Sequence, residues 1–289
     1  MIPYSAGINK PITRMVIVIQ CKDSVGLVAA ISTVLAEAGY NIVSMREHVD
    51  QEENKFFARI VVDHIADQRS LENAIEKVLP TNAVVKVNPL PEKNIVVLVT
   101  KEYHCLSDIL TRNHFKTLGA NVQCVIGNHP DLKNITERFD VPFHLVSHEN
   151  KSKEVFEAEL VASILPYEPD YIVLAKFMRI LSQEFVTTFM LKIINIHHSF
   201  LPAFTGANPY RQAYTRGVKI IGATAHFVTN ELDEGPIITQ KIIPVNHSFT
   251  LSDLVRAGRE NETAALAKAM QLVFEDRVFV SDNKTVVFE

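Results

Sequence analysis

The pattern of hydrophobic and polar positions over the first 88 residues predicts four strands and two helices. Short apolar runs indicate buried strands, whereas apolar residues that recur every three or four positions indicate helices. The helices are expected to begin near Leu27 and Leu71. The strands are expected over 14–20, 41–48, 55–63 and 83–87. This strand-helix-strand-strand-helix-strand order is that of the ferredoxin-like arrangement.

The pattern changes near residue 95. Residues 89–94 contain two prolines among polar neighbours, which interrupts both periodicities and predicts a linker. Beyond it, apolar strands alternate with helices as far as Ile196, which predicts a Rossmann-like, mainly parallel sheet covered on both faces. Two paired strands, a long helix over 251–274 and a terminal hairpin are expected to follow. The sequence therefore predicts an α/β protein with domains at 1–88 and 95–289.

The densest group of chemically useful side chains follows the last predicted parallel strand. Asn195 and His197 end an apolar run, and because side chains alternate along a strand, both are expected to point the same way. Asp233 follows within the apolar frame L-D-E-G-P-I-I. An amide and an imidazole can donate hydrogen bonds to a developing oxyanion, and a carboxylate can move a proton. Because ligand crevices form at strand ends of α/β sheets, Asn195 and His197 are expected to face such a crevice.

These motifs resemble the formyltransferase family, whose members use or hydrolyse 10-formyltetrahydrofolate. The resemblance rests on N-I-H-H-S-F-L-P from Asn195, G-A-T-A-H-F-V from Gly222 and L-D-E-G-P-I-I from Leu232. It implies catalytic roles for Asn195, His197 and Asp233. The segment V-L-A-K-F-M-R-I-L-S from Val173 resembles the family's folate pocket. By the same resemblance, the folate-binding residues are expected to be Met178, Arg179, Ile180, Leu181, His226 and Val228.

His198 doubles the histidine of the first motif. In the family's transferases this position is usually proline, so the sequence is more similar to the hydrolytic branch. The resemblance gives His198 a supporting role, with simple packing as the alternative. If the strand continued, the ring of His198 would face away from that of His197, a poor geometry for one shared metal ion.

The loop over 100–106 bears on the choice of substrate. It follows the first strand of the second domain, lacks glycine and contains Glu102 and Tyr103. In the glycinamide ribonucleotide transferases that the second domain resembles, a Gly-Ser-rich loop at this place cradles the acceptor's phosphate at a helix N-terminus. The loop here is poorly suited to that role, with a contact from Lys101 as the alternative. Water is therefore the expected nucleophile.

The resemblance thus implies hydrolysis of 10-formyltetrahydrofolate to formate and tetrahydrofolate. Such a reaction balances one-carbon folates and supplies formate for purine synthesis. The folate is the substrate, and neither a cofactor nor a metal ion is expected. Two alternatives stay open: transfer of the formyl group to an amine acceptor such as glycinamide ribonucleotide, and a catalytically silent amino-acid sensor.

The first domain resembles the ACT domain, a small amino-acid-sensing module. The likeness rests on C-K-D-S-V-G-L-V from Cys21 and on G-Y-N-I from Gly39. It implies an amino-acid effector, with methionine and glycine as the expected ligands, and a homo-oligomer formed through this domain. Dimerisation without a ligand is the alternative. The positions that match the ligand site are Asp23, Gly26, Leu27, Asn41 and Ile42.

Composition excludes several other classes. With 29 Lys and Arg against 33 Asp and Glu, the net charge is −4, so there is no basic excess of the kind that indicates a nucleic-acid partner. No apolar run approaches the ~20 residues of a membrane span, and no signal core begins the chain, which predicts a cytoplasmic protein. The three cysteines are dispersed, which argues against a disulfide framework or a structural zinc site.

Overall fold

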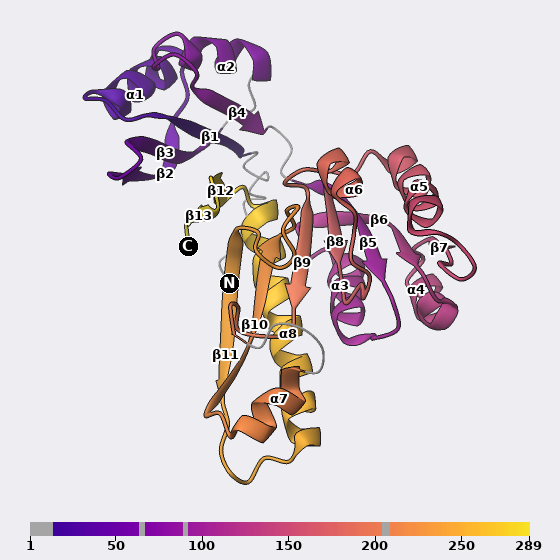
Figure 1. Ribbon diagram of the computed structural model, residues 1–289. Helices are drawn as coiled ribbons and strands as arrows, with labels where there is room; N and C mark the ends of the chain where they lie inside the picture. Colours follow the sequence, from indigo (N-terminus) through magenta and orange to yellow (C-terminus); the bar gives the residue numbers. More distant parts are fainter. Residues whose placement is uncertain (1–13, 64–66, 89–91, 204–208) are drawn as a thin grey trace, which may run out of the picture. The chain divides into compact units, whose positions relative to one another are not determined.

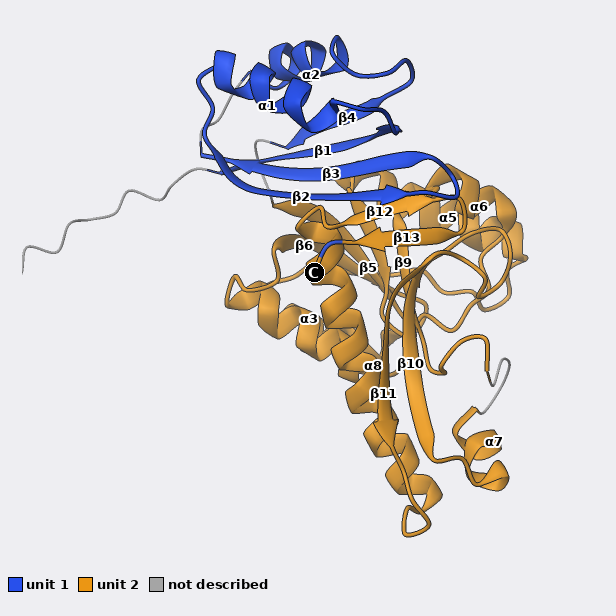
Figure 2. Cartoon of the chain, turned by 90° about the vertical axis from the view of Figure 1, so that its left-hand side faces the viewer, with its two compact units in different colours: residues 1–91, 288 blue, residues 92–287, 289 orange. Residues whose placement is uncertain are grey.

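The computed structural model describes residues 14–63, 67–88, 92–203 and 209–289. The chain divides into two compact units, residues 1–91 with Phe288 (unit 1) and residues 92–287 with Glu289 (unit 2) (Figure 2). The predicted linker was extended too far, because a strand already begins at Lys93. The polar side chain of Lys93 concealed this strand: it is buried and pairs with Asp276 at 3.1 Å. Residues 89–91 of the predicted linker lie outside the described residues.

Unit 1 is a four-stranded antiparallel sheet in the order β2-β3-β1-β4, with both helices on one face (Figure 1). This confirms the predicted ferredoxin-like fold. Leu27, Ile31 and Leu35 lie at helical spacing and pack into the core against the sheet. The elements are β1 (Met15–Lys22), α1 (Leu27–Glu37), β2 (Ile42–Asp50), β3 (Lys55–Val62), α2 (Gln68–Glu76) and β4 (Val84–Asn88).

Unit 2 is built on a seven-stranded sheet in the order β11-β10-β9-β8-β5-β6-β7. Strands β5 to β9 are parallel, and β10 and β11 are antiparallel additions at one edge. The strands are β5 (Lys93–Val99), β6 (Ala120–Gly127), β7 (Phe143–Leu145), β8 (Tyr171–Leu174), β9 (Ile193–His197), β10 (Ile220–Phe227) and β11 (Ile237–Pro244). A separate hairpin, predicted from the sequence, consists of β12 (Val278–Ser281) and β13 (Lys284–Val287).

Helices cover both faces of this sheet. One face of β5, with Ile95, Val97 and Val99, packs against α3 and α8, while Val96 and Leu98 face α5 and α6. This confirms the predicted three-layer α/β architecture. The helices are α3 (His104–His114), α4 (Lys133–Glu137), α5 (Lys153–Ile164), α6 (Gln183–Thr188), α7 (Pro209–Arg216) and α8 (Leu251–Phe274), with short 3-10 turns η1 (Pro130–Leu132) and η2 (Leu165–Tyr167). Within the described ranges, no helix is both long and apolar enough to cross a membrane.

The chain order of the strands indicates where a ligand can bind. From β5 the chain proceeds to β6 and β7 on one side, and then returns to β8 and β9 on the other. The loops after β5 and β8 therefore diverge and leave a crevice at the carboxyl ends of the strands. The backbone N–H of Met178, after β8, donates to the Thr100 hydroxyl, after β5, at 2.9 Å. This bond joins the two loops at the crevice.

Candidate active site

A cavity of about 600 Å3 lies at the ends of β8 and β9, and the loop between β10 and β11 closes one side of it. Its size is within the range typical of small-molecule sites. It brings together all the candidates of the catalytic domain, which are Met178, Arg179, Ile180, Leu181, Asn195, His197, His198, His226, Val228 and Asp233.

The pairing of β9 with β10 determines how Asn195 is held. In the antiparallel register, His226 lies directly opposite Asn195. The His226 Nδ1 is 2.9 Å from the carbonyl of Phe227, which can only accept, so this nitrogen carries the proton. The other ring nitrogen, Nε2, then accepts from the Asn195 amide at 3.2 Å. Burial lowers the pKa of His226, in keeping with a neutral ring, and the second amide hydrogen of Asn195 stays available for a ligand.

Asp233 completes the group. Its Oδ1 lies 3.3 Å from Nδ1 of His197 and 3.8 Å from Nε2 of His226. The hydrogen bond from His197 holds the pKa of Asp233 below its usual value, so the carboxylate is ionised at neutral pH. With Nδ1 directed at Asp233, the Nε2 atom of His197 is buried without a partner among the described residues. Because a buried polar atom without a partner is costly, it marks a place where a ligand atom can bind.

His198 lies differently from the expectation. Its ring stacks on that of His197, with the centroids 4.9 Å apart and the planes 18° from parallel. The expectation that the two rings face opposite sides was wrong, because β9 ends at His197 and the alternation of a strand does not extend further. Burial, followed by the positive charge of Lys176, lowers the pKa of His198 to about 4. A neutral imidazole therefore lines the cavity beside His197.

The Asp233 loop is fixed by a close backbone approach. The Phe227 N–H donates to the Pro236 carbonyl at 3.0 Å, which closes the loop. A Cβ at Gly235 would lie only 1.8 Å from the Phe227 carbonyl oxygen, so no other residue fits there without moving the backbone. Asp233 itself has a φ of 58°, a left-handed conformation that Asp and Asn adopt more readily than most residues.

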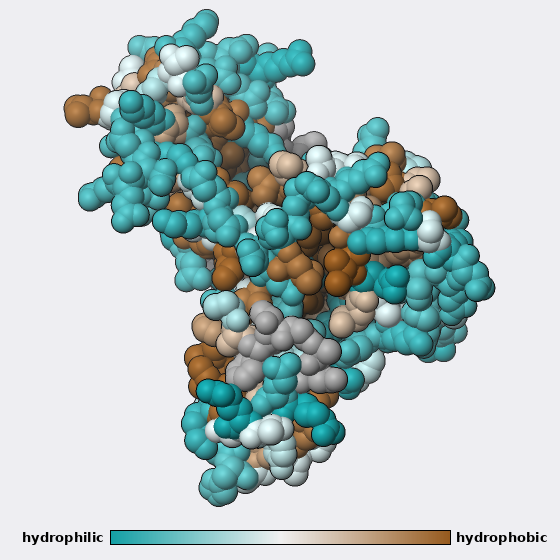
Figure 3. Space-filling view, viewed as in Figure 1, coloured by the Kyte–Doolittle hydropathy of each residue, from teal (hydrophilic) through white to brown (hydrophobic). Residues whose placement is uncertain are grey.

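The remaining wall of the cavity is largely apolar. Met178, Ile180 and Leu232 are large hydrophobic residues that stay exposed although they line it. Figure 3 shows hydrophobic side chains gathered on unit 2 in the region of β8, β9 and α6. An apolar wall opposite a group of polar side chains suits a flat aromatic ligand that carries one reactive polar group.

The sequence analysis did not single out Lys176 as a residue of the cavity. Lys176 is buried and lines the cavity directly after β8. A single lysine at the end of an apolar run is usually solvated, so nothing in the sequence distinguished it. Its partner Glu262 lies in the centre of α8, and only the fold brings the two within 3.2 Å.

Among the described residues, one group has the composition of a metal site: His104, Cys105 and Glu262. Both oxygens of Glu262 are already bonded, one to Lys176 and His104 and the other to Tyr210. Burial raises the pKa of the Cys105 thiol, which disfavours the thiolate that binds metals. The lysine ammonium beside the carboxylate also repels a cation. This group is therefore better suited to its internal ion pair than to a metal.

The candidate ligand residues of unit 1 separate into two groups. Asp23, Gly26 and Leu27 lie around the start of α1, at the end of the sheet where Lys22 pairs with Lys55. Asn41 and Ile42 lie at the opposite end, where Ile42 and Met15 both pair with Val62. Within one chain, α1 therefore separates the two groups by about 16 Å, and their role in holding a ligand stays a prediction. The Leu27 side chain is also buried in the core, so only its backbone is available.

Comparison with known proteins agrees with both units. Residues 93–270 match the formyl transferase family, and residues 15–79 match the ACT domain family. Among curated relatives, the chain is 47% identical to the formyltetrahydrofolate deformylase of Haemophilus influenzae, over 96% of this chain and 99% of the relative. It is 48% identical to that of Escherichia coli K12, over 92% and 95% of the two chains.

Solved structures give the same picture. The formyltetrahydrofolate deformylase of Pseudomonas syringae superposes with a TM-score of 0.90 at 38% identity, covering 99% of this chain and 96% of that one. A glycinamide ribonucleotide transformylase from Symbiobacterium toebii superposes with a TM-score of 0.66 at 31% identity, covering 69% of this chain and 95% of the other. The chain belongs to the formyl transferase family and, within it, to the formyltetrahydrofolate deformylases that also carry an ACT domain.

The close approach at Gly235 gives a direct test of the Asp233 loop. We expect Gly235→Ala to lower the rate of formate release by about 100-fold or more, because a shift of about 1 Å in a catalytic group can cost that much. Glu234→Ala, at the exposed neighbouring position, is the matched control and should stay close to wild type. Steady-state kinetics on both variants measure the effect. Wild-type activity in Gly235→Ala would show that the position of this loop is not critical.

Proposed function

We propose that the protein hydrolyses 10-formyltetrahydrofolate to formate and tetrahydrofolate, with Asn195, His197 and Asp233 as the catalytic residues. One observation carries these assignments. A buried Nε2 of His197 without a partner and a spare amide hydrogen of Asn195 line the same cavity, beside an ionised carboxylate. Two donors and a base are what hydrolysis of a formamide requires.

The proposed reaction begins when water attacks the formyl carbon. The carbonyl oxygen becomes an oxyanion, which the Asn195 amide stabilises together with His197 in its imidazolium form, whose Nδ1–H donates to Asp233 and whose Nε2–H donates to the oxyanion. Asp233 holds His197 through Nδ1 and accepts the proton of the water while the new C–O bond forms, when that proton becomes acidic. The C–N bond then breaks, the proton passes to the folate nitrogen, and formate leaves.

The folate is proposed to lie along the apolar wall. The exposed side chains of Met178 and Ile180 offer apolar contacts to its rings. Apart from the Met178 N–H, which is bonded to Thr100, the backbone groups of the segment 178–181 are proposed to bind the polar edge of the pterin. Arg179 is exposed at this side of the cavity, where a guanidinium suits the carboxylates of the folate glutamate. His226 and Val228 face this segment across the cavity.

The proposal is tested by supplying 10-formyltetrahydrofolate and measuring formate, with and without glycinamide ribonucleotide. We expect formate in equal amounts in both cases, because the loop after β5 offers Glu102 and an exposed Tyr103 instead of a phosphate cradle. A comparable rate of formation of formylglycinamide ribonucleotide would replace hydrolysis with formyl transfer. No conversion of the folate in either case would leave the amino-acid sensor as the remaining alternative.

The role of Asp233 is tested by Asp233→Asn. Asparagine tolerates the positive φ of this position, so the loop should keep its conformation. We expect kcat to fall by about 100-fold or more, the usual contribution of a general base, while the folate still binds. Equilibrium binding and kcat are measured on the same preparation. A variant that loses binding but keeps kcat would assign Asp233 to the pocket and not to the chemistry.

We also propose that unit 1 binds an amino-acid effector at the start of α1 and joins copies of the chain. Gly26, with a φ of 93°, precedes a helix whose first N–H groups receive no side-chain cap. Free N–H groups of this kind favour a carboxylate. Strand β2 lies at the edge of the sheet and is mostly exposed, so it is available to pair with a second copy.

Calorimetry with methionine and with glycine tests the effector site. A Cβ at Gly26 would meet no protein atom within 4 Å, so a larger side chain would extend into the space proposed for the ligand. We expect Gly26→Val to abolish the heat of binding, and Val25→Ala, at the exposed neighbour, to keep it. If neither amino acid binds the wild-type protein at millimolar concentration, unit 1 serves assembly alone, which light scattering would show as a multiple of the chain mass.

A further inference from the structure

A second polar cluster lies next to the catalytic residues and is not used by the proposed reaction. At its centre is Glu262 of α8, whose side chain is 1% exposed. Its Oε2 is 3.2 Å from Nζ of Lys176 and 2.7 Å from Nε2 of His104, and its Oε1 accepts from the Tyr210 hydroxyl at 2.5 Å. The cluster thus joins the end of β8 with α3, α7 and α8.

Burying the charged groups of this cluster costs free energy. Ion pairs withdrawn from water lose hydration that their mutual attraction barely replaces, so they are weak evidence for stability. Burial alone would raise the pKa of Glu262, but the bonds from His104, Lys176 and Tyr210 lower it to about 2. Lys176 also has a φ of 62°, a backbone conformation that favours glycine. A strained backbone and a buried charge at one position point to a functional constraint.

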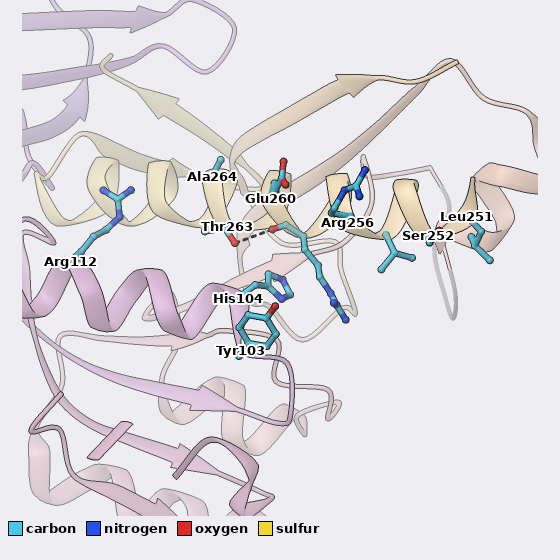
Figure 4. A pocket seen from close by; sticks show the side chains of 11 residues that line it. Tyr103, His104, Arg112, Leu251, Ser252, Arg256, Glu260, Thr263 and Ala264 are labelled. Carbon is cyan, nitrogen blue, oxygen red and sulfur yellow. Dashed lines mark hydrogen bonds between the residues drawn. The ribbon is translucent and has the colours of Figure 1, made fainter. Parts of the chain in front are cut away.

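The cluster separates two cavities of unit 2. On one side is the catalytic cavity, which Lys176 lines beside His198. On the other is a groove of about 900 Å3 between α3 and α8, which Tyr103 and His104 line. Figure 4 shows both side chains at the start of α3, facing the residues of α8. Lys176 and His104 bind the same oxygen of Glu262, so these three side chains, which we call the wall, run from the lining of the cavity to the lining of the groove.

We infer that Lys176 is a specificity-determining residue, which closes the catalytic cavity toward this groove so that water reaches the formyl carbon and amines do not. The inference rests on the proposed function. It addresses why a chain that shares its catalytic fold with the glycinamide ribonucleotide transformylases at 31% identity would use water. The side chain of Lys176, fixed by Glu262, fills the volume through which a primary amine would approach from the groove.

Opening the wall would make a second reaction possible. The amine nitrogen attacks the formyl carbon, the bond from that carbon to the folate nitrogen breaks, and a bond to the amine forms. One amine proton passes to the folate nitrogen, so the products are a formamide and tetrahydrofolate. The same oxyanion donors serve both reactions, so access to the formyl carbon can decide between them.

The experiment uses Lys176→Gly, which removes the side chain and suits the positive φ. The full-length protein is supplied with 10-formyltetrahydrofolate and glycinamide, and formate and N-formylglycinamide are measured, with an enzyme-free control. We expect the ratio of formylated amine to formate to rise about tenfold or more over wild type, equivalent to about 1.4 kcal/mol between the two barriers. Lys176→Met fills a similar volume without the charge and should keep the wild-type ratio.

His104→Ala opens the same wall from the side of α3 and provides an independent variant if Lys176→Gly does not fold. Alanine is a good helix former, so α3 should begin as before. We expect the ratio of formylated amine to formate to rise in this variant as well. A folded Lys176→Gly or His104→Ala that releases formate without formylated amine would overturn the inference, as would equal amine capture by Lys176→Met. Failure of the wild-type protein to release formate would instead refute the proposed function.

Discussion

The catalytic arrangement depends on one backbone contact, where Gly235 lies against the Phe227 carbonyl. This contact and the bond between Phe227 and Pro236 close the loop that carries Asp233. Within that loop Asp233 has a positive φ, which persists only where the surrounding structure holds it. The carboxylate consequently reaches His197 and sets the direction of its ring. Without this closed loop, Asp233 would not be held against His197. Its pKa would then not be lowered by that contact, and the Nε2 of His197 would not be directed into the cavity.

The register of two strands supplies the rest of the site. Because β10 runs antiparallel to β9, His226 lies opposite Asn195 and fixes its amide. Strand β10 also leads into the loop that contains Asp233, so one pairing positions residues that are separated in sequence. The crevice lies at the ends of the parallel strands β5 and β8, and Asp233 lies in the loop between the antiparallel strands β10 and β11. The mixed sheet is therefore a requirement of this site.

Sequence patterns predicted the site residues that lie close together in the chain, but not the contacts between residues far apart in the chain. Asn195 and His197 share a strand, and Asp233 follows in a short hairpin frame, so their proximity could be predicted from alternation and motif. His104 and Glu262 are 158 positions apart, each is one of several polar residues in its helix, and no local pattern predicts that they meet. The stacking of His198 was missed for a related reason, because the end of a strand is less certain than its existence.

The two polar clusters of unit 2 illustrate how a binding site differs from a wall. In the first, the Nε2 of His197 has no partner among the described residues, and the carboxylate behind the ring is partly accessible. In the second, both oxygens of Glu262 are bonded and its charge is balanced by a buried lysine. A buried ring nitrogen without a partner beside a cavity is stabilised when a ligand binds to it, whereas an ion pair with all its hydrogen bonds made resists rearrangement. This difference supports the proposal that the chemistry takes place at the first cluster and that the second restricts what reaches it.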